Sequence, residues 1–224
     1  PELEKFILSK MYSLNKKFET CFQKYDFHNL YKELLNFCTV DLSAFYFDIR
    51  KDALYCDPIN SDKRKSCVNI LNVLLKSLLR WFAPILSFTT EEIYQLVSKK
   101  SKSIHLEKFL KFPDKFKNQK NDEKWSELMK IRDVCNISIE EKRSSKEIGS
   151  SLEANLDINL NEKYKEIVRD IDLSELCIVS KANINFNKQS DILVETKKAS
   201  GNKCAVCWKI RKDPCERHPK CQIS

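Results

Sequence analysis

The chain has 224 residues, of which 42% are hydrophobic and 32% are charged, and its formal net charge is +8. This length allows one or two folded domains, and the positive charge favours an anionic partner. Only two glycines occur, Gly149 and Gly201, which excludes the glycine-rich loops that hold ATP or dinucleotides. No apolar run can span a bilayer and no signal peptide is visible, so we expect no membrane association and a cytoplasmic protein whose ten cysteines stay reduced.

Residues 1–98 carry the pattern of amphipathic helices. Apolar side chains such as Phe6, Leu14 and Phe18 recur at helical spacing, and residues 69–79, "NILNVLLKSLL", form one wide apolar stripe. Side chains that can cap the start of a helix are Asp26, Ser61, and Thr89 or Thr90. We therefore predict a mainly α-helical chain that opens with an antiparallel bundle of four or five helices.

The pattern changes after residue 98. Residues 99–124 are rich in Lys, Asn and Ser and contain Pro113, and we interpret them as a linker crossing the bundle surface. The elements expected beyond the linker are a helix at 123–143, a short helix at 161–170, and strands at 151–160, 175–186 and 191–198. Residues 125–195 are thus predicted to form a small α/β domain.

Residues 196–224 contain a cluster of cysteines, with one histidine, that can bind a metal ion. Cys204 and Cys207 form a C-x2-C pair, a spacing that places two thiolates at adjacent corners of a tetrahedron. Cys215 and His218 offer a second pair, and Cys221 competes with His218 as the fourth ligand. Zinc suits reduced thiols and imidazole, so we predict a zinc knuckle; the alternative is a group of free or buried structural cysteines.

This terminal module has little else to hold it together. Its few apolar side chains, such as Val206 and Ile210, cannot offset the entropy lost on ordering, whereas structural zinc contributes on the order of 10 kcal/mol. With all four positions filled by protein there is no open position for water. We therefore expect one structural Zn²⁺ per chain and no catalytic role for it.

The same module is strongly basic. From 197 to 224 the cations are Lys197, Lys198, Lys203, Lys209, Arg211, Lys212, Arg217 and Lys220, and the anions are Asp213 and Glu216. Basic groups beside an aromatic ring suit single-stranded RNA, with the phosphates neutralised and a base stacked. The alternative is a solvated basic tail with Trp208 covering the zinc site, and for Trp208 we favour this packing role.

Four stretches together resemble one family. They are "LLNFCTVDLSAFYFDIRKDALYCD", "LLRWFAPILSFTTEEIY", "EKRSSKEIGSSLEA" and the terminal "KCAVCW". In this order they strongly resemble the carboxyl-terminal part of bacterial isoleucyl-tRNA synthetases, over nearly the whole chain. The second stretch is similar in the valyl and leucyl enzymes, whereas the first stretch and the terminal knuckle point to the isoleucyl family.

The resemblance implies specific roles. The bundle is expected to be an anticodon-binding domain of the class I synthetase type, and the zinc module is expected to help hold the anticodon stem-loop of isoleucine tRNA. The family's second ligand pair reads C-x-R-C, and residues 215–218 match it with His in the last place, which favours His218 over Cys221. Family members usually carry four cysteines here, and the loop between the pairs is shorter in this chain.

The motifs of the family's catalytic core are absent. No HIGH motif occurs, and "KKSKS" at 99–103 follows a bundle helix and not a nucleotide-binding core, so we do not assign it as the KMSKS loop. The chain opens on Pro1, within a helical pattern. We therefore expect an inactive, monomeric binding part of a longer ligase, whose amino-terminal catalytic and editing domains would use ATP and Mg²⁺.

The predicted RNA contacts are Arg50, Lys51, Trp208, Lys209, Arg211, Lys212 and Arg217. Arg50 and Lys51 have an alternative role, because cations near a helix end also pair with neighbouring carboxylates such as Asp48 and Asp52. No residue is predicted to be catalytic. Two other functions remain open: a free-standing zinc-containing RNA-binding module, and a structural or protein-interaction zinc module.

Overall fold

The computed structural model describes residues 1–98, 102–188, 192–213 and 215. It divides into two compact units. The first unit comprises Pro1–Leu54 and Ile59–Asn121, and the second comprises Tyr55–Pro58 and the residues from Asp122 onward. No described helix combines the length and the apolar character that crossing a membrane requires.

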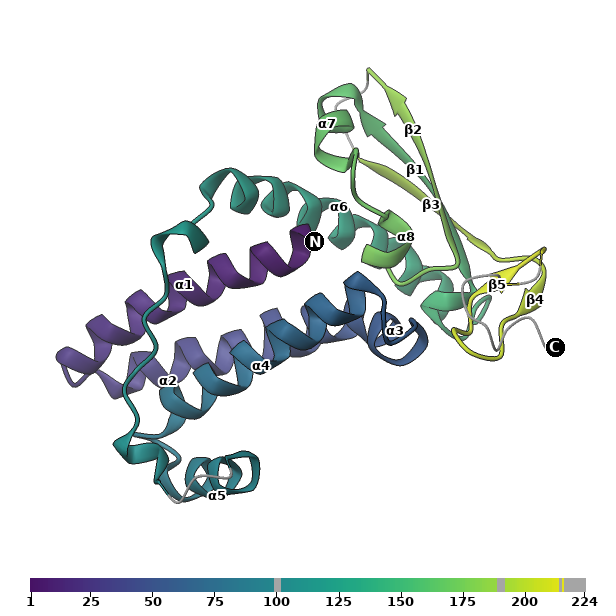
Figure 1. The fold of residues 1–224 in the computed structure, drawn as a ribbon. Helices are drawn as coiled ribbons and strands as arrows, with labels where there is room; N and C mark the ends of the chain where they lie inside the picture. The colour runs from purple at the N-terminus through teal and green to yellow at the C-terminus, as the bar shows by residue number, and fades with distance from the viewer. Residues whose placement is uncertain (99–101, 189–191, 214, 216–224) are drawn as a thin grey trace. The chain divides into compact units, whose positions relative to one another are not determined.

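The first unit is helical. α1, α2 and α4 lie side by side (Figure 1). The stretch η1, which has the wider turns of a π-helix, joins α2 to α3 without a break. The elements are α1 (Glu2–Gln23), α2 (Phe27–Asn36), η1 (Phe37–Phe47), α3 (Asp48–Cys56), α4 (Asp62–Phe82), α5 (Ser87–Val97), η2 (Ile104–Leu106) and η3 (Asp114–Phe116).

An aromatic cluster forms the centre of this unit. The Trp81 ring lies 6.3 Å from the Phe37 ring and 6.5 Å from the Phe18 ring, measured between centroids. Trp81 Nε1 donates a 3.0 Å hydrogen bond to Oδ1 of the buried Asn15, so its polar edge is satisfied inside the core. The apolar stripe of α4 and the apolar face of α1 both supply buried residues, as the sequence predicted.

Two of the three helix caps predicted from the sequence are present in the structure. Asp26 accepts from the amide of Asn29, and Ser61 accepts from the amide of Arg64, which confirms both as caps. The prediction for Thr89 or Thr90 is wrong, because α5 begins earlier, at Ser87. Thr90 is buried inside the helix, where its hydroxyl donates to the carbonyl oxygen of Leu86.

Residues 102–121 belong to the first unit, and we call them the strap. Phe109 packs on Phe18 with 4.8 Å between ring centroids, and Phe112 stacks on Trp81 at 6.1 Å. Arg80 of α4 donates to the carbonyl oxygen of Lys108. The segment interpreted as a linker is therefore held on the bundle by aromatic packing.

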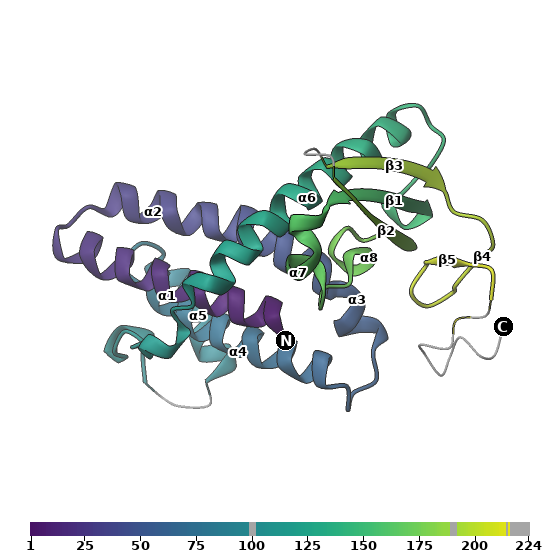
Figure 2. The same cartoon turned by 90° about the horizontal axis from the view of Figure 1, so that it is seen from above.

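The second unit combines helices with a three-stranded sheet of order β2-β1-β3, in which β1 is parallel to β2 and antiparallel to β3. Alternate residues of β1, such as Leu156 and Ile158, are fully buried. The long helix α6 lies against the sheet (Figure 2), where Ser138 bonds to Val194 and Thr196 of β3. The elements are α6 (Gln119–Ser144), η4 (Ser151–Glu153), β1 (Ala154–Asn161), η5 (Glu162–Tyr164), α7 (Lys165–Val168), α8 (Leu173–Leu176), β2 (Lys181–Asn187), β3 (Leu193–Lys198), β4 (Asn202–Lys203) and β5 (Ile210–Arg211).

The strand predicted at 175–186 begins later, at Lys181. The Asp172 carboxylate accepts from the amides of Ser174 and Glu175, so it caps the one-turn helix α8 where a strand was expected. Periodicity over a few apolar residues cannot separate a short buried helix from a strand, and the cap decides this case.

Arg50 is a correction to the predicted RNA contacts. Its guanidinium is buried, and it donates to both carboxylate oxygens of Glu4 at 2.7 and 2.9 Å. The pair joins α1 to α3 inside the first unit, so the charge of Arg50 is not available to a phosphate. Lys51 is exposed and pairs with Asp48 at 3.0 Å, as its alternative role predicted.

Replacing Arg50 by Met should lower the free energy of unfolding of the chain by about 3–5 kcal/mol, because the substitution leaves the Glu4 carboxylate buried without its partner. Lys51→Met is the matched control, and its exposed pair should contribute less than about 1 kcal/mol. The double variant Glu4→Leu/Arg50→Met should recover most of the stability. Urea unfolding measures the free energy of unfolding of all three variants. An Arg50→Met variant as stable as the Lys51→Met control would contradict the structural role of the Glu4–Arg50 pair.

Candidate metal centre and its basic surface

A short hairpin carries the cysteine cluster. β4 and β5 pair through Asn202 with Arg211 and through Lys203 with Ile210. Gly201 precedes the hairpin at φ +130°, and a Cβ atom at this position would lie 2.1 Å from the carbonyl oxygen of Arg211. Only glycine allows the two backbones to approach so closely, so the glycine before the knuckle is a requirement of the hairpin.

The turn of the hairpin is closed by hydrogen bonds from three backbone amides. The amide of Cys204 donates to the carbonyl oxygen of Lys209, and the amide of Trp208 donates to that of Cys204. The amide of Val206 donates to the Cys204 sulfur at 3.4 Å. This turn brings the two cysteines of the C-x2-C pair to the same side of the loop, with a backbone donor directed at one sulfur.

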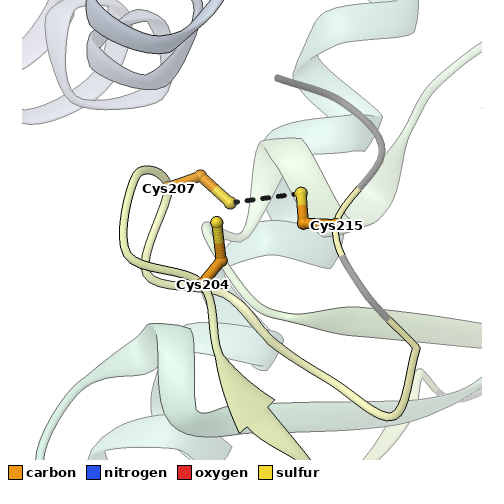
Figure 3. Close-up of side chains that lie close together, drawn as sticks. All are labelled: Cys204, Cys207 and Cys215. Carbon is orange, nitrogen blue, oxygen red and sulfur yellow. Dashed lines mark hydrogen bonds between the residues drawn. The ribbon is translucent and has the colours of Figure 1, made fainter. Parts of the chain in front are cut away.

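Three thiols converge at this turn. The sulfur atoms of Cys204, Cys207 and Cys215 all lie within 4.8 Å of one another, and the Cys207 and Cys215 sulfurs are 4.0 Å apart (Figure 3). Zn–S bonds of about 2.3 Å in a tetrahedron place neighbouring sulfurs about 3.8 Å apart. The separation therefore fits a shared metal ion, and the cluster has the geometry to bind one.

Burial controls the charge state of the Cys207 thiol. Burial raises the pKa of Cys207 to about 12, although the backbone amide of Lys209 acts in the opposite direction. Without a metal ion the Cys207 thiol is therefore neutral at pH 7. A bound cation would displace the proton and stabilise the thiolate, so metal binding at this site is coupled to proton release.

The positions of the fourth ligand candidates, His218 and Cys221, lie outside the described residues, as does Arg217. The structure brings a further cysteine to the cluster. Cys56 packs against Cys207 and Cys215, and its thiol donates to the carbonyl oxygen of Val206 over 3.6 Å. Sequence reasoning missed Cys56 because it is 150 residues from Val206 and has no local spacing signal.

The hairpin is attached to the sheet of its own unit through one serine. Ser180 Oγ accepts from the amide of Ile210 at 2.6 Å and donates to the carbonyl oxygen of Leu152 at 2.5 Å. The Ser180 amide also donates to the carbonyl oxygen of Ala154 in β1. The cysteine turn is therefore held in a fixed position beside the sheet of the second unit.

Trp208 is 60% exposed, which corrects the packing role that we favoured for it. It occupies the left-handed backbone region at φ 63°, and the Lys203 ammonium lies 5.6 Å from the centre of its ring. A bulky residue in this backbone region is strained, and such strain is concentrated at functional positions. The ring is presented to solvent beside a cation.

Lys209 is a second correction to the predicted RNA contacts, after Arg50. Its residue exposure is 6%, so its side chain is enclosed and is not available as a surface contact to RNA. Its charge acts on Asp172: burial alone would raise the pKa of that carboxyl, but hydrogen bonds from Ser174 and Glu175 together with the charge of Lys209 lower it. Arg211 and Lys212 are exposed, as a contact surface requires.

Cobalt(II) is a suitable probe of the cluster, because thiolate-to-cobalt charge transfer gives a strong near-ultraviolet absorption. The unmodified chain should show this band at one equivalent of metal, and Cys207→Ser should lose most of it, since a buried thiolate ligand is removed. Cys38→Ser, a half-buried cysteine of the first unit, is the matched control and should keep the band. Equal bands in both variants would exclude the three-thiol site.

The comparisons with known proteins show similarity to isoleucine–tRNA ligases. Isoleucine–tRNA ligase of Pelagibacter ubique is 62% identical over 218 residues, which cover 97% of this chain and 24% of the relative. The enzymes of the same name from Bartonella quintana and Agrobacterium fabrum are each 36% identical over 224 residues, covering 95% of this chain and 23% of each relative. The chain thus spans about a quarter of the length of these relatives.

The family comparison covers most of the chain. The sequence profile described as "Anticodon-binding domain of tRNA ligase" matches residues 4–172, which include the helical first unit and about half of the sheet-containing unit. The observed order of a helical region followed by a small mixed sheet agrees with the fold that the sequence resemblance implied. The chain therefore belongs to the family of anticodon-binding domains of tRNA ligases.

Proposed function

We propose that the chain is the tRNA-binding carboxyl-terminal region of an isoleucine–tRNA ligase and that it recognises the anticodon arm of isoleucine tRNA. The observation that carries this proposal is the match of residues 4–172 to the anticodon-binding family, together with 62% identity to a named isoleucine–tRNA ligase over 97% of the chain. ATP-dependent aminoacylation would then be performed by catalytic and editing domains elsewhere in the same polypeptide. In this proposal the protein acts as a cytoplasmic monomer.

We further propose that the metal of the cysteine cluster is Zn²⁺ and that its role is structural. Three thiols within 4.8 Å of one another suit zinc, and a further ligand from His218 or Cys221 would close the coordination shell. When bound, the ion would fix the hairpin that presents Trp208. Comparing zinc retention in His218→Ala and Cys221→Ala identifies which residue closes the shell.

In the second unit the RNA-binding surface is proposed to consist of Trp208, Arg211 and Lys212, with Arg217 nearby in sequence. The exposed Trp208 ring offers a stacking platform for an unpaired base, and the two exposed cations suit phosphate. Lys51 of the first unit is a further candidate, although a carboxylate already pairs with it. Arg50 and Lys209 are left out because they are buried.

A second candidate function is a free-standing RNA-binding module with the same surface. It predicts binding to tRNA whatever the anticodon, whereas the main proposal predicts preference for the isoleucine anticodon. Transcripts that differ only in the anticodon therefore separate the two, and equal affinity for all of them would remove the main proposal.

Trp208→Gly tests the stacking role with little effect on folding, because glycine adopts the backbone conformation of Trp208 without strain. We expect unchanged metal content and thermal stability, with about a tenfold lower affinity for isoleucine tRNA, since one stacked base contributes about 1–3 kcal/mol. Filter binding or fluorescence anisotropy measures the change. A variant that binds as tightly as the unmodified chain would contradict the stacking role.

Charge removal at the hairpin gives the complementary test. Arg211→Gln/Lys212→Gln should weaken tRNA binding about tenfold and reduce its salt dependence, because fewer phosphates are then neutralised by the protein. The matched control is Lys165→Gln/Arg169→Gln, which removes two exposed cations at the helix α7 of the same unit. Equal effects of the two double variants would show that the hairpin is not a specific contact surface.

A further inference from the structure

The strap displays a set of exposed cations. Its six lysines are all exposed, and within the described part of the chain none of them forms an ion pair with a carboxylate. The six are Lys102, Lys108, Lys111, Lys115, Lys117 and Lys120. Three of the lysines on α1 differ from them, since Lys10, Lys16 and Lys17 each lie within 4 Å of a carboxylate oxygen of the same unit.

The two acidic residues of the strap do not neutralise these lysines. Glu107 accepts a 2.8 Å hydrogen bond from the Tyr94 hydroxyl and pairs with Arg80 at 2.8 Å. Asp114 accepts from the Tyr12 hydroxyl at 2.8 Å. Both carboxylates are thus engaged with the helices, where they hold the strap in place. The positive charge of the outward-facing lysines remains uncompensated.

The strap is also fixed in position, which distinguishes it from a loose basic tail. Phe109 and Phe112 pack into the aromatic cluster, and Asn118 donates its amide to Ser9 of α1. The strap contains the short turns η2 and η3 and ends in the first residues of α6, so its lysines are distributed along an anchored segment and are not gathered at one point. In Figure 1 this teal segment runs along the outside of the helices of the first unit.

We propose that the strap of the first unit binds the phosphodiester backbone of RNA, in addition to the RNA contacts proposed for the cysteine hairpin of the second unit. This inference deepens the proposed function and rests on it for the identity of the RNA. A series of exposed ammonium groups on an anchored segment, without carboxylate partners among the described residues, suits a linear polyanion. Lysine ammonium groups bind phosphates and do not by themselves read base edges, so the strap lysines are expected to contribute affinity without anticodon specificity.

The test compares two triple variants of the 224-residue chain. Lys111→Gln/Lys115→Gln/Lys117→Gln removes three unpaired strap charges, and Lys10→Gln/Lys16→Gln/Lys17→Gln removes three paired charges from α1 of the same unit. Both change the net charge equally, so a difference between them reports on location. Urea unfolding first establishes that both variants are folded, and Lys111→Arg/Lys115→Arg/Lys117→Arg keeps the charge as a rescue control.

The strap variant should bind isoleucine tRNA about tenfold or more weakly at ~0.1 M salt, and the slope of log affinity against log salt should fall by about 0.7–0.9 for each phosphate that the variant no longer binds. The weakening should be the same for transcripts with any anticodon, and the arginine variant should restore binding. The α1 variant should be affected much less. Equal weakening in the two glutamine variants, or unchanged binding by the strap variant, would overturn the proposal.

Two further binding experiments distinguish the strap proposal from the proposed recognition of the anticodon. Poly(U), which has no anticodon arm, should show the same reduced salt slope with the strap variant, so a failure of anticodon recognition alone leaves the strap proposal standing. Poly-glutamate of equal charge should compete weakly with RNA. If poly-glutamate competes as strongly as RNA, the strap is a surface for acidic protein and the assignment to RNA is overturned.

Discussion

The convergence of three thiols at the carboxyl-terminal hairpin is the interaction on which the order of the proposed RNA-binding surface depends. The hairpin has two-residue strands and few apolar side chains, and hairpins of this size are not stable by themselves in water. Its attachments are the hydrogen bonds of Ser180 and the packing of Cys56. A metal ion shared by Cys204, Cys207 and Cys215 would add the strong restraint that this short segment otherwise lacks.

Charged side chains serve two different purposes in this chain. In the first unit the buried Glu4–Arg50 pair and the engaged carboxylates Glu107 and Asp114 hold elements together. The strap lysines and the exposed cations of the hairpin face solvent without such a structural duty. This separation explains why net charge alone is a poor guide to a binding surface: the cations that pair within the fold contribute to stability, whereas the unpaired cations remain available to an anionic partner.

The sequence was informative where the determining interaction is local. The spacing of Cys204 and Cys207, the caps at Asp26 and Ser61 and the alternation along β1 all depend on neighbours within a few residues, and the structure agrees with each. The family resemblance extended this to the order of the parts, because four separated stretches had to occur together.

The sequence failed where the partner is distant in the chain. Arg50 pairs with Glu4, which is 46 residues away, so its burial could not be inferred from the surrounding helix. Lys209 is buried and its charge acts on Asp172 of an earlier segment, and Cys56 reaches the cluster from a position 150 residues before Val206. The strap looked like a polar linker because three phenylalanines among many lysines give no helical or strand period, although they pack into the core or against one another.

Amide hydrogen exchange with and without bound metal tests the central claim most directly. The amides of Cys204, Trp208 and Ile210 are hydrogen-bonded in the hairpin, and those of β1 serve as the internal reference. If the metal orders the hairpin, complete removal by a chelator should abolish protection of these three amides and leave β1 protected. Unchanged protection of all three in the metal-free chain would contradict the account.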